Sequence, residues 1–169
     1  MDGHTNPHLQ TVDLPSLPIT SADFHPSGAS ILLTGPRPFY YSFDLQSGSV
    51  TRSAVKSTSI SNGDLSMQIR KFSPDGNLLA VSGKQGYIYL LDWRVSGGEQ
   101  VIASLKSNSP INSLTWSPSG SYIYSLGRES EVVVWDVSHR QCVNKWSDEG
   151  GYGSRHLCLD SHSSYLSIG

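Results

Sequence analysis

The sequence predicts an all-β protein built from three copies of one four-stranded unit and the beginning of a fourth. An aromatic residue, a proline and a glycine recur at fixed offsets in FHPSG, FSPDG and WSPSG, which begin at Phe24, Phe72 and Trp116. Short apolar runs that are typical of strands follow each of these turns. No segment has the apolar spacing of an amphipathic helix. Together these observations indicate a repeated β unit.

The repeat has a constant internal spacing. The three aromatic residues are 48 and 44 residues apart, and each is followed by a proline at +2, a glycine at +4 and a glycine at +11. At +20 stands an aspartate behind an apolar residue. Units of one length, separated by variable connections, are the signature of a repeat architecture. The predicted structural repeat positions are Phe24, Gly28, Asp44, Phe72, Gly76, Asp92, Trp116, Gly120, Trp135 and Asp136.

Each unit resolves into four strands. The first strand leads into the turn, at residues 20–24, 68–72 and 112–116. The second strands are expected at 30–35, 78–83 and 122–127. The third strands are expected at 40–45, 87–93 and 131–137. The fourth strands are expected at 50–55, 100–105 and 141–146. In the turn, Pro74 presets φ and Gly76 accepts a positive φ without a Cβ clash.

Composition limits the class of protein. The chain has 169 residues, 37% of them hydrophobic and 15% charged, which suits one packed domain. A net charge of −2 with scattered Lys and Arg gives no electrostatic footprint for nucleic acid. The sequence contains neither an apolar run of membrane-spanning length nor the apolar segment of a secretory signal near its beginning. Two cysteines are too few for a disulfide framework, and a reducing compartment is expected.

The repeat resembles the WD40 β-propeller family. A period of 44 to 48 residues, four strands, a proline–glycine turn and the pair Trp135–Asp136 carry this resemblance. It implies a partial propeller of about three blades plus the start of another. Only one Trp-Asp pair is literal, and Gln85 and Glu129 replace the tight-turn aspartate of the family. We therefore expect apolar burial, rather than the family's buried side-chain hydrogen-bond network, to hold the blades.

The resemblance also implies a division of the chain. We expect residues 1–19 to be a lead-in that includes a closing outer strand at 8–14, followed by blades at 20–63, 64–110 and 111–153. Residues 154–169 would contain the first strands of a truncated blade. Because propellers close with four to eight blades, the chain is expected to be part of a longer propeller. Its apolar blade face would then make the isolated polypeptide prone to aggregate.

A narrower resemblance is carried by DGHTNP at 2–7, the aromatic blades and DVSHRQCVNKWSDEG at 136–150. Together they resemble the small nucleolar RNA-associated protein 18 family. This implies a non-catalytic scaffold in the nucleus and nucleolus, within the UtpB subcomplex of the small-subunit processome, which supports pre-ribosomal RNA processing and 40S subunit biogenesis. Its partners would be other propeller subunits and processome proteins, with pre-ribosomal RNA contacted mainly indirectly. The alternative is a WD40 adaptor in another complex, such as a peptide-reading substrate receptor.

Candidate partner-binding residues lie in the loops between second and third strands, which share one rim of the disc. Arginine and aromatic residues dominate interface energetics. The candidates are Arg37, Phe39, Lys84, Arg128 and Arg155, and any direct contact to RNA is expected from rim residues such as Arg128 or Arg155. Solvated loops without a partner are the competing interpretation. The aromatics Tyr87, Tyr89 and Trp93 belong to a strand expected to pack between blades, so they do not predict a base-stacking platform.

The sequence offers no catalytic or metal site. Residues 53–56 match S-x-x-K, but the companion motifs are absent and the segment is expected to be a strand rather than a helix. Zinc ligands normally come as close pairs, and this pattern is missing from Cys142, His156, Cys158 and His162. We therefore expect no enzyme activity, no cofactor, no metal, no membrane partner and no small-molecule substrate. His25 is expected to cap its own turn.

Overall fold

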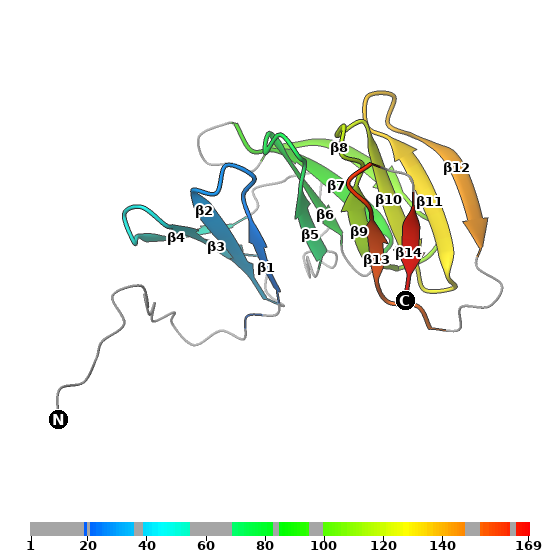
Figure 1. The fold of residues 1–169 in the computed structure, drawn as a ribbon, viewed down its shortest axis with the longest axis horizontal. Helices are drawn as coiled ribbons and strands as arrows, with labels where there is room; N and C mark the ends of the chain where they lie inside the picture. The colour runs from blue at the N-terminus through cyan, green and yellow to red at the C-terminus, as the bar shows by residue number, and fades with distance from the viewer. Residues whose placement is uncertain are drawn as a thin grey trace.

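The computed structural model describes residues 19, 21–35, 39–54, 69–82, 85–94, 100–147, 153–162 and 165–169. These residues form antiparallel sheets that stand side by side along the molecule (Figure 1), and none of them is helical. The prediction of an all-β, propeller-like fold is therefore confirmed. Residues 1–18, including the expected closing strand at 8–14, lie outside the described part of the chain. The predicted domain boundaries remain a prediction.

Each complete sheet is a meander whose neighbouring strands follow chain order. The first blade contains β1 (Ser21–Phe24), β2 (Ser30–Thr34), β3 (Phe39–Asp44) and β4 (Val50–Ala54). The second blade contains β5 (Ile69–Phe72), β6 (Leu78–Ser82), β7 (Tyr87–Asp92) and β8 (Gln100–Lys106). The third blade contains β9 (Ile111–Trp116), β10 (Tyr122–Gly127), β11 (Glu131–Asp136) and β12 (Gln141–Ser147). The fourth unit is the hairpin β13 (Leu157–Leu159) and β14 (Leu166–Ile168).

The antiparallel order gives the molecule two rims. Turns after the first and third strands of each blade lie on one, which we call the turn rim. Loops after the second strands and the segments that join blades lie on the other, which we call the linker rim. This follows directly from the alternating strand directions of each meander. Residues on the two rims therefore face different surroundings.

Glycine is required in the turn between the first two strands. Gly28, Gly76 and Gly120 have φ values of 71°, 74° and 73°, which residues with a Cβ rarely adopt. The positive φ predicted for Gly76 is confirmed. The three glycines differ in their surroundings, because a Cβ on Gly28 would meet nothing within 4 Å, whereas one on Gly76 would lie 2.6 Å from His25 Nε2.

A side-chain acceptor at the start of this turn replaces a missing ladder bond. The Ser73 hydroxyl accepts from the backbone N–H of Leu78 at 2.9 Å, and Ser117 accepts from Tyr122 at 3.0 Å. Asp160 has this role in the fourth unit, where its carboxylate accepts from the N–H of Tyr165 at 2.7 Å. Short side chains that bond nearby backbone favour turns over continued strand. The fourth unit thus repeats the turn without its proline and glycine.

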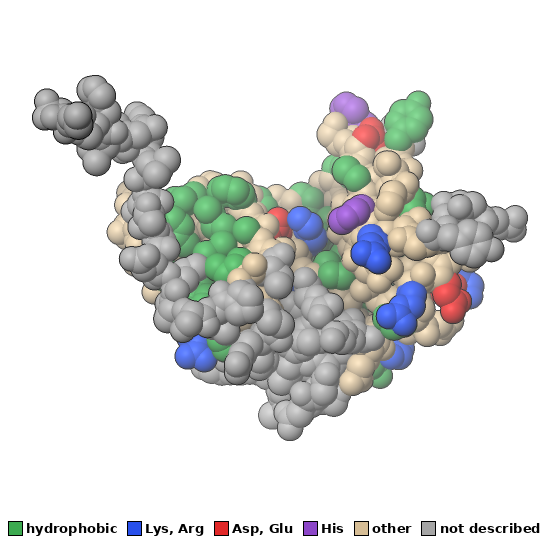
Figure 2. All heavy atoms as spheres, turned by 90° about the horizontal axis from the view of Figure 1, so that it is seen from below, with side chains coloured by type: hydrophobic (Ala, Val, Ile, Leu, Met, Phe, Trp, Pro, Cys, Tyr) green, Lys and Arg blue, Asp and Glu red, His purple; other side chains and the backbone are tan. Residues whose placement is uncertain are grey.

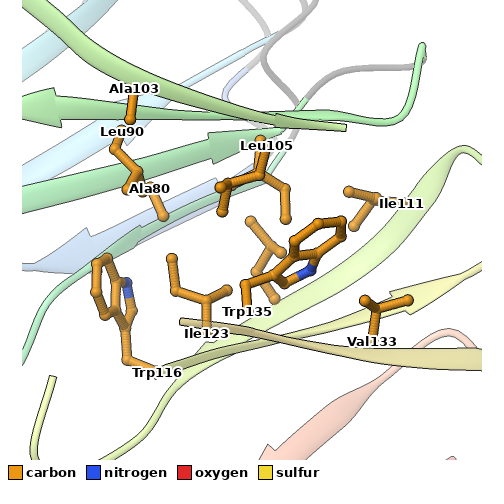
Figure 3. Close-up of a cluster of buried hydrophobic side chains, with 11 residues drawn as sticks. Ala80, Leu90, Ala103, Leu105, Ile111, Trp116, Ile123, Val133 and Trp135 are labelled. Carbon is orange, nitrogen blue, oxygen red and sulfur yellow. The ribbon is translucent and has the colours of Figure 1, made fainter. Parts of the chain in front are cut away.

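The hydrophobic core consists of seams between neighbouring blades. The first seam joins Leu32 and Tyr40 to Phe72 and the inward side chains of β6 and β7. The second seam joins the second blade to the third and contains the buried residues of Figure 3. There, Leu90 and Leu105 of one sheet face Trp116, Ile123 and Trp135 of the next. The third seam packs Leu126 and Val132 against Leu157.

Hydrogen bonds between first strands reinforce the seams. The Trp116 indole N–H donates across the second seam to the carbonyl of Lys71 at 2.9 Å. Across the first seam, Asp23 accepts from the backbone N–H of Phe72 at 3.2 Å and pairs with the Lys71 ammonium at 3.2 Å. Each blade is therefore tied to its neighbour by polar as well as apolar contacts.

The three repeat aromatics are equivalent in position but not in burial. Phe72 and Trp116 are 8% and 7% exposed, because each packs on the preceding blade. Phe24 is 63% exposed. Ile19 and Leu45, also near the first blade, are exposed too. The repeat spacing identifies all three positions correctly, but Phe24 does not contribute to the described core.

The third blade contains a buried side-chain hydrogen bond. The sequence led us to expect apolar burial in place of the WD40 family's buried hydrogen-bond network, and in this blade the Trp135 indole N–H also donates to the Ser125 hydroxyl at 2.8 Å. Both side chains are buried. The equivalent residues of the second blade, Val81 and Leu91, are apolar and cannot form such a bond. The bond needs an indole donor, so among these blades the Trp135–Asp136 pair identifies the blade that can form it.

Arg70 is the exception to the apolar character of the first seam. Its residue is 2% exposed, and its guanidinium nitrogens have no hydrogen-bond partner among the described residues. The nearest aromatic contact is the Tyr40 ring, whose centroid lies 5.7 Å from Arg70 Cζ. Burial lowers the pKa of Arg70 to about 10, although the Tyr40 hydroxyl opposes this shift. The side chain is therefore a buried cation at neutral pH.

Candidate protein-interaction surface

The predicted contact residues are only partly placed by the structure. Arg37 and Lys84 lie outside the described residues. Phe39 begins β3 and is half-buried, with the guanidinium carbon of Arg52 4.0 Å above its ring centroid. Arg128 and Arg155 are exposed on the linker rim. Their role as contacts remains a prediction.

Backbone hydrogen bonds hold Arg128 and Arg155 in place. The N–H of Arg128 donates to the carbonyl of Pro110 at 3.0 Å, and that of Arg155 to Gly169 at 2.7 Å. Neither bond engages the side chain, so the guanidinium groups extend from anchored backbone. Such a group loses less conformational freedom on binding than one on an unanchored loop.

A cation on the outer strand recurs beside the first residue of the third strand in each complete blade. Arg52 lies over Phe39, and the Lys106 ammonium lies 3.9 Å from the centroid of Tyr87. In the third blade, the Lys145 ammonium is 3.9 Å from the Glu131 carboxylate. Sequence reasoning missed Lys106 and Lys145. The signal was present, because Phe39, Tyr87 and Glu131 all stand at +15 of the repeat.

The two rims differ in their balance of charge, although the turn rim also carries Arg94 and Arg140. Exposed cations outnumber carboxylates on the linker rim, where Lys106, Arg128, Lys145 and Arg155 accompany Glu129 and Glu131. Figure 2 views the molecule from below, and its Lys and Arg side chains gather mainly in the right half, over the third and fourth units. The turn rim carries Asp44, Asp75, Asp92, Asp136 and Asp160.

The turn-rim aspartates are structural caps. Asp44 accepts from the backbone N–H of Ser47 at 2.7 Å, which lowers its pKa. The Arg94 guanidinium donates to both carboxylate oxygens of Asp92, which lowers the pKa of Asp92 to about 2. The backbone N–H of His139 lowers the pKa of Asp136 in the same way. Carboxylates held ionised by their own turns are poorly suited to proton transfer near neutral pH.

His25 connects two turns. Its Nδ1 accepts from the backbone N–H of Ser27 at 3.2 Å, which confirms the prediction that it caps its own turn. Its Nε2 also lies 3.1 Å from the carbonyl oxygen of Gly76 in the next blade, and its ring meets Phe72 edge-on at 4.9 Å. These contacts favour the tautomer with the proton on Nε2. The cap is thus also an interblade contact.

The described residues contain no group of three or more His, Cys, Asp or Glu side chains that could hold a metal ion. Cys142 and Cys158 are free and exposed, on β12 and β13. Ser53 lies on β4, whereas Lys56 lies outside the described residues. Tyr89 is 4% exposed and stacked on the half-buried Tyr87, as expected for a strand between blades. In the part of the chain that is described, no helical segment has the length and hydropathy of a membrane span.

Comparison with known proteins shows which proteins the chain is similar to. Residues 99–136, from the end of the second unit through β11, match the WD domain, G-beta repeat. The chain is 30% identical over 169 residues to a U3 small nucleolar RNA-associated protein 18 homolog from Arabidopsis thaliana, and 31% identical over 172 residues to that of Mus musculus. Both alignments cover 100% of this chain but 30% of the relative.

The similarity to other WD40 proteins is lower. Echinoderm microtubule-associated protein-like 3 from Homo sapiens is 24% identical over 162 residues, which cover 94% of this chain and 17% of that protein. The chain therefore spans less than a third of the length of these relatives. It carries a WD40 repeat in a partial β-propeller, and along its full length it is similar to the U3 small nucleolar RNA-associated protein 18 proteins of plants and animals.

Proposed function

We propose that this protein is a non-catalytic WD40 scaffold in ribosome biogenesis, acting in the nucleolar small-subunit processome. The observation that carries the proposal is the similarity of the whole chain to relatives named for U3 small nucleolar RNA association. The fold supports it, because stacked blades are a rigid support for loops that bind other proteins. Pre-ribosomal RNA processing and 40S subunit biogenesis would then depend on contacts that this protein makes.

The proposed partners are other propeller subunits of the UtpB subcomplex and further processome proteins. Arg128 and Arg155 on the linker rim would contribute to these contacts, together with Phe39, Arg37 and Lys84. Pre-ribosomal RNA would be held mainly through those proteins, since the Lys and Arg residues are scattered and the Tyr89 ring of β7 is buried, unlike the exposed stacking rings of single-strand binders. No cofactor is part of the proposed function.

Affinity purification of the tagged protein from growing cells tests the proposal. We expect other propeller subunits to be recovered with and without nuclease, and precursor ribosomal RNA to be recovered without nuclease. Recovery of ligase or signalling proteins without ribosomal precursors would instead identify an adaptor in another complex. Protein mass spectrometry and RNA sequencing of the same eluates distinguish these outcomes.

Paired charge reversals test the role of the linker rim. Arg128→Glu should reduce the recovery of propeller partners, whereas Arg140→Glu on the turn rim should not, because both residues are exposed but lie on opposite rims. If Arg128 also touches RNA, the salt dependence of RNA binding should become shallower by about one phosphate contact. An unchanged salt dependence would limit Arg128 to protein contacts.

A further inference from the structure

A groove of about 210 Å³ lies between the second and third blades. Lys106 and Asn108 line it at the end of β8, Val133 and Trp135 line it from β11, and Cys142 and Lys145 line it from β12. The groove therefore has an apolar floor on the third blade and a lysine on each blade. Sequence reasoning could not find it, because its two sides belong to different repeats.

The two lysines are available for an anionic partner. The Lys145 side chain is 61% exposed, and its distance of 3.9 Å from Glu131 is too long for a hydrogen bond. Lys106 donates to the backbone carbonyl of Gln85 and lies over the Tyr87 ring, so its charge is not neutralised there. Within the described residues, neither lysine has a hydrogen-bonded carboxylate.

The groove between the first and second blades differs in this respect. It is larger, about 340 Å³, and Asp75, Trp93 and Arg94 are among its lining residues. Its charges are already satisfied, because Arg94 binds both carboxylate oxygens of Asp92 and Asp75 accepts from Ser73 and Asn77. The volume of a groove therefore does not show whether it binds a charged partner. Of these two grooves, only the one between the second and third blades has cations without a bonded carboxylate.

The outer strand beside the groove suits an extended partner. β12 is the last strand of its sheet, and all seven of its residues are exposed. Val143 and Trp146 on this strand are 46% and 39% exposed. An edge strand leaves backbone donors and acceptors that a peptide in extended conformation can pair with.

We propose that this groove binds an extended acidic segment of a partner protein. Carboxylates of the segment pair with Lys106 and Lys145, and one of its apolar side chains packs on Val133 and the Trp135 ring edge. The observations favour peptide over RNA, because the Trp135 residue is only 5% exposed and cannot stack on a base. This inference depends on the fold and not on the proposed role in ribosome biogenesis.

Binding of a defined probe tests the inference. The probe is a fluorescein-labelled decapeptide of alternating glutamate and valine, measured by anisotropy with the full 169-residue chain. We expect saturable binding that weakens about tenfold or more in the Lys106→Gln/Lys145→Gln variant, because two charge pairs are lost. Arg52→Gln is the matched control, since Arg52 is the equivalent outer-strand cation of the first blade and should leave binding unchanged.

Cysteine alkylation gives a second readout that needs no mutation. The acidic decapeptide should slow maleimide labelling of Cys142, which lines the groove, but not of Cys158, which is also exposed and lies on β13. Equal protection of both cysteines, or peptide binding unaffected by the lysine substitutions, would overturn the inference. So would a decauridine oligonucleotide that binds through these lysines while the acidic peptide does not. Thermal melts of each variant confirm that folding is retained.

Discussion

The first and second seams use the same repeat positions but differ in polarity. In the second seam, Trp116 packs in one apolar cluster with Leu90 and Leu105, and its indole N–H is satisfied by a carbonyl. The first seam contains the guanidinium of Arg70, which has no hydrogen-bond partner among the described residues, and a histidine bridge to Gly76. Apolar burial is the larger source of stability. One repeat template can therefore give seams of unequal strength, and the second seam should be the stronger of the two.

Truncating the repeat aromatics should produce the largest effects. Trp116→Ala should lower the free energy of unfolding by about 3 to 5 kcal/mol, because it leaves a cavity and an unsatisfied carbonyl. Phe72→Ala should cost somewhat less, and Phe24→Ala less than about 0.5 kcal/mol, as for other exposed sites. Urea midpoints at constant m-value measure all three. A Phe24→Ala loss comparable to that of Trp116→Ala would mean that the Phe24 side chain is covered.

Alanine substitutions at the turn glycines test the histidine bridge of the first seam. Gly28→Ala and Gly120→Ala should each cost about 1 kcal/mol, because alanine is strained at their positive φ. Gly76→Ala should cost more than either of these, because its Cβ would also displace the His25 ring. Adding His25→Ala should remove that excess. Equal losses at all three glycines would show that the histidine contact contributes nothing.

Replacing the buried arginine should strengthen the weaker seam. Arg70→Met keeps a long side chain and removes a buried charge without a partner among the described residues, so stability should rise by about 1 kcal/mol. The melting temperatures of Arg70→Met and of Val81→Ala measure this. Val81 is the residue paired with Arg70, and Val81→Ala creates a cavity there, so it should lower the melting temperature. Loss of stability in Arg70→Met would reveal an acceptor for the guanidinium outside the described residues.

Acid should weaken the capped turns of all three blades. The expected loss of stability per residue is the smallest of the effects predicted for these variants. The folded-state pKa values of Asp44, Asp75, Asp92 and Asp136 lie below the ordinary value of 3.8, so their contribution is complete above that value. It is lost as pH falls through the folded pKa, which is about 2 for Asp92. Asp92→Asn should flatten the decline in stability between pH 4 and 2. An unchanged slope would contradict the Arg94 cap.

The fold could be predicted from sequence because its signals are local. Pro74 and Gly76 report a turn through their own φ preferences, and the recurrence of this turn gives the blade count of the chain. The Trp135–Ser125 bond was missed because a serine nine residues after Trp116 has no counterpart in the other units. The burial of the repeat aromatics was harder to predict from the sequence than the turns. Phe24 and Phe72 have the same local pattern, and only the neighbouring blade makes them differ.

Less of the candidate interaction surface could be predicted from the sequence. Arg128 and Arg155 could be placed on one rim because the repeat defines the rim loops, and their role as partner contacts remains a prediction. The groove was missed because Lys106 and Lys145 come together only across a seam, and spacing within one repeat carries no information about that. Arg70 shows the same limit, since alternation along β5 predicts which face it occupies but not whether an acceptor lies opposite.

Seams between neighbours also determine how the molecule should open. The apolar clusters of the described residues lie between neighbouring units, so local opening should spread from one unit to the next rather than occur everywhere at once. Amide hydrogen exchange should be slowest in β6, β7, β10 and β11, which flank the second seam, and fastest in the outer strands β4 and β12. The indole bond from Trp116 to Lys71 would then separate late, after the first blade has already exchanged its protons with solvent.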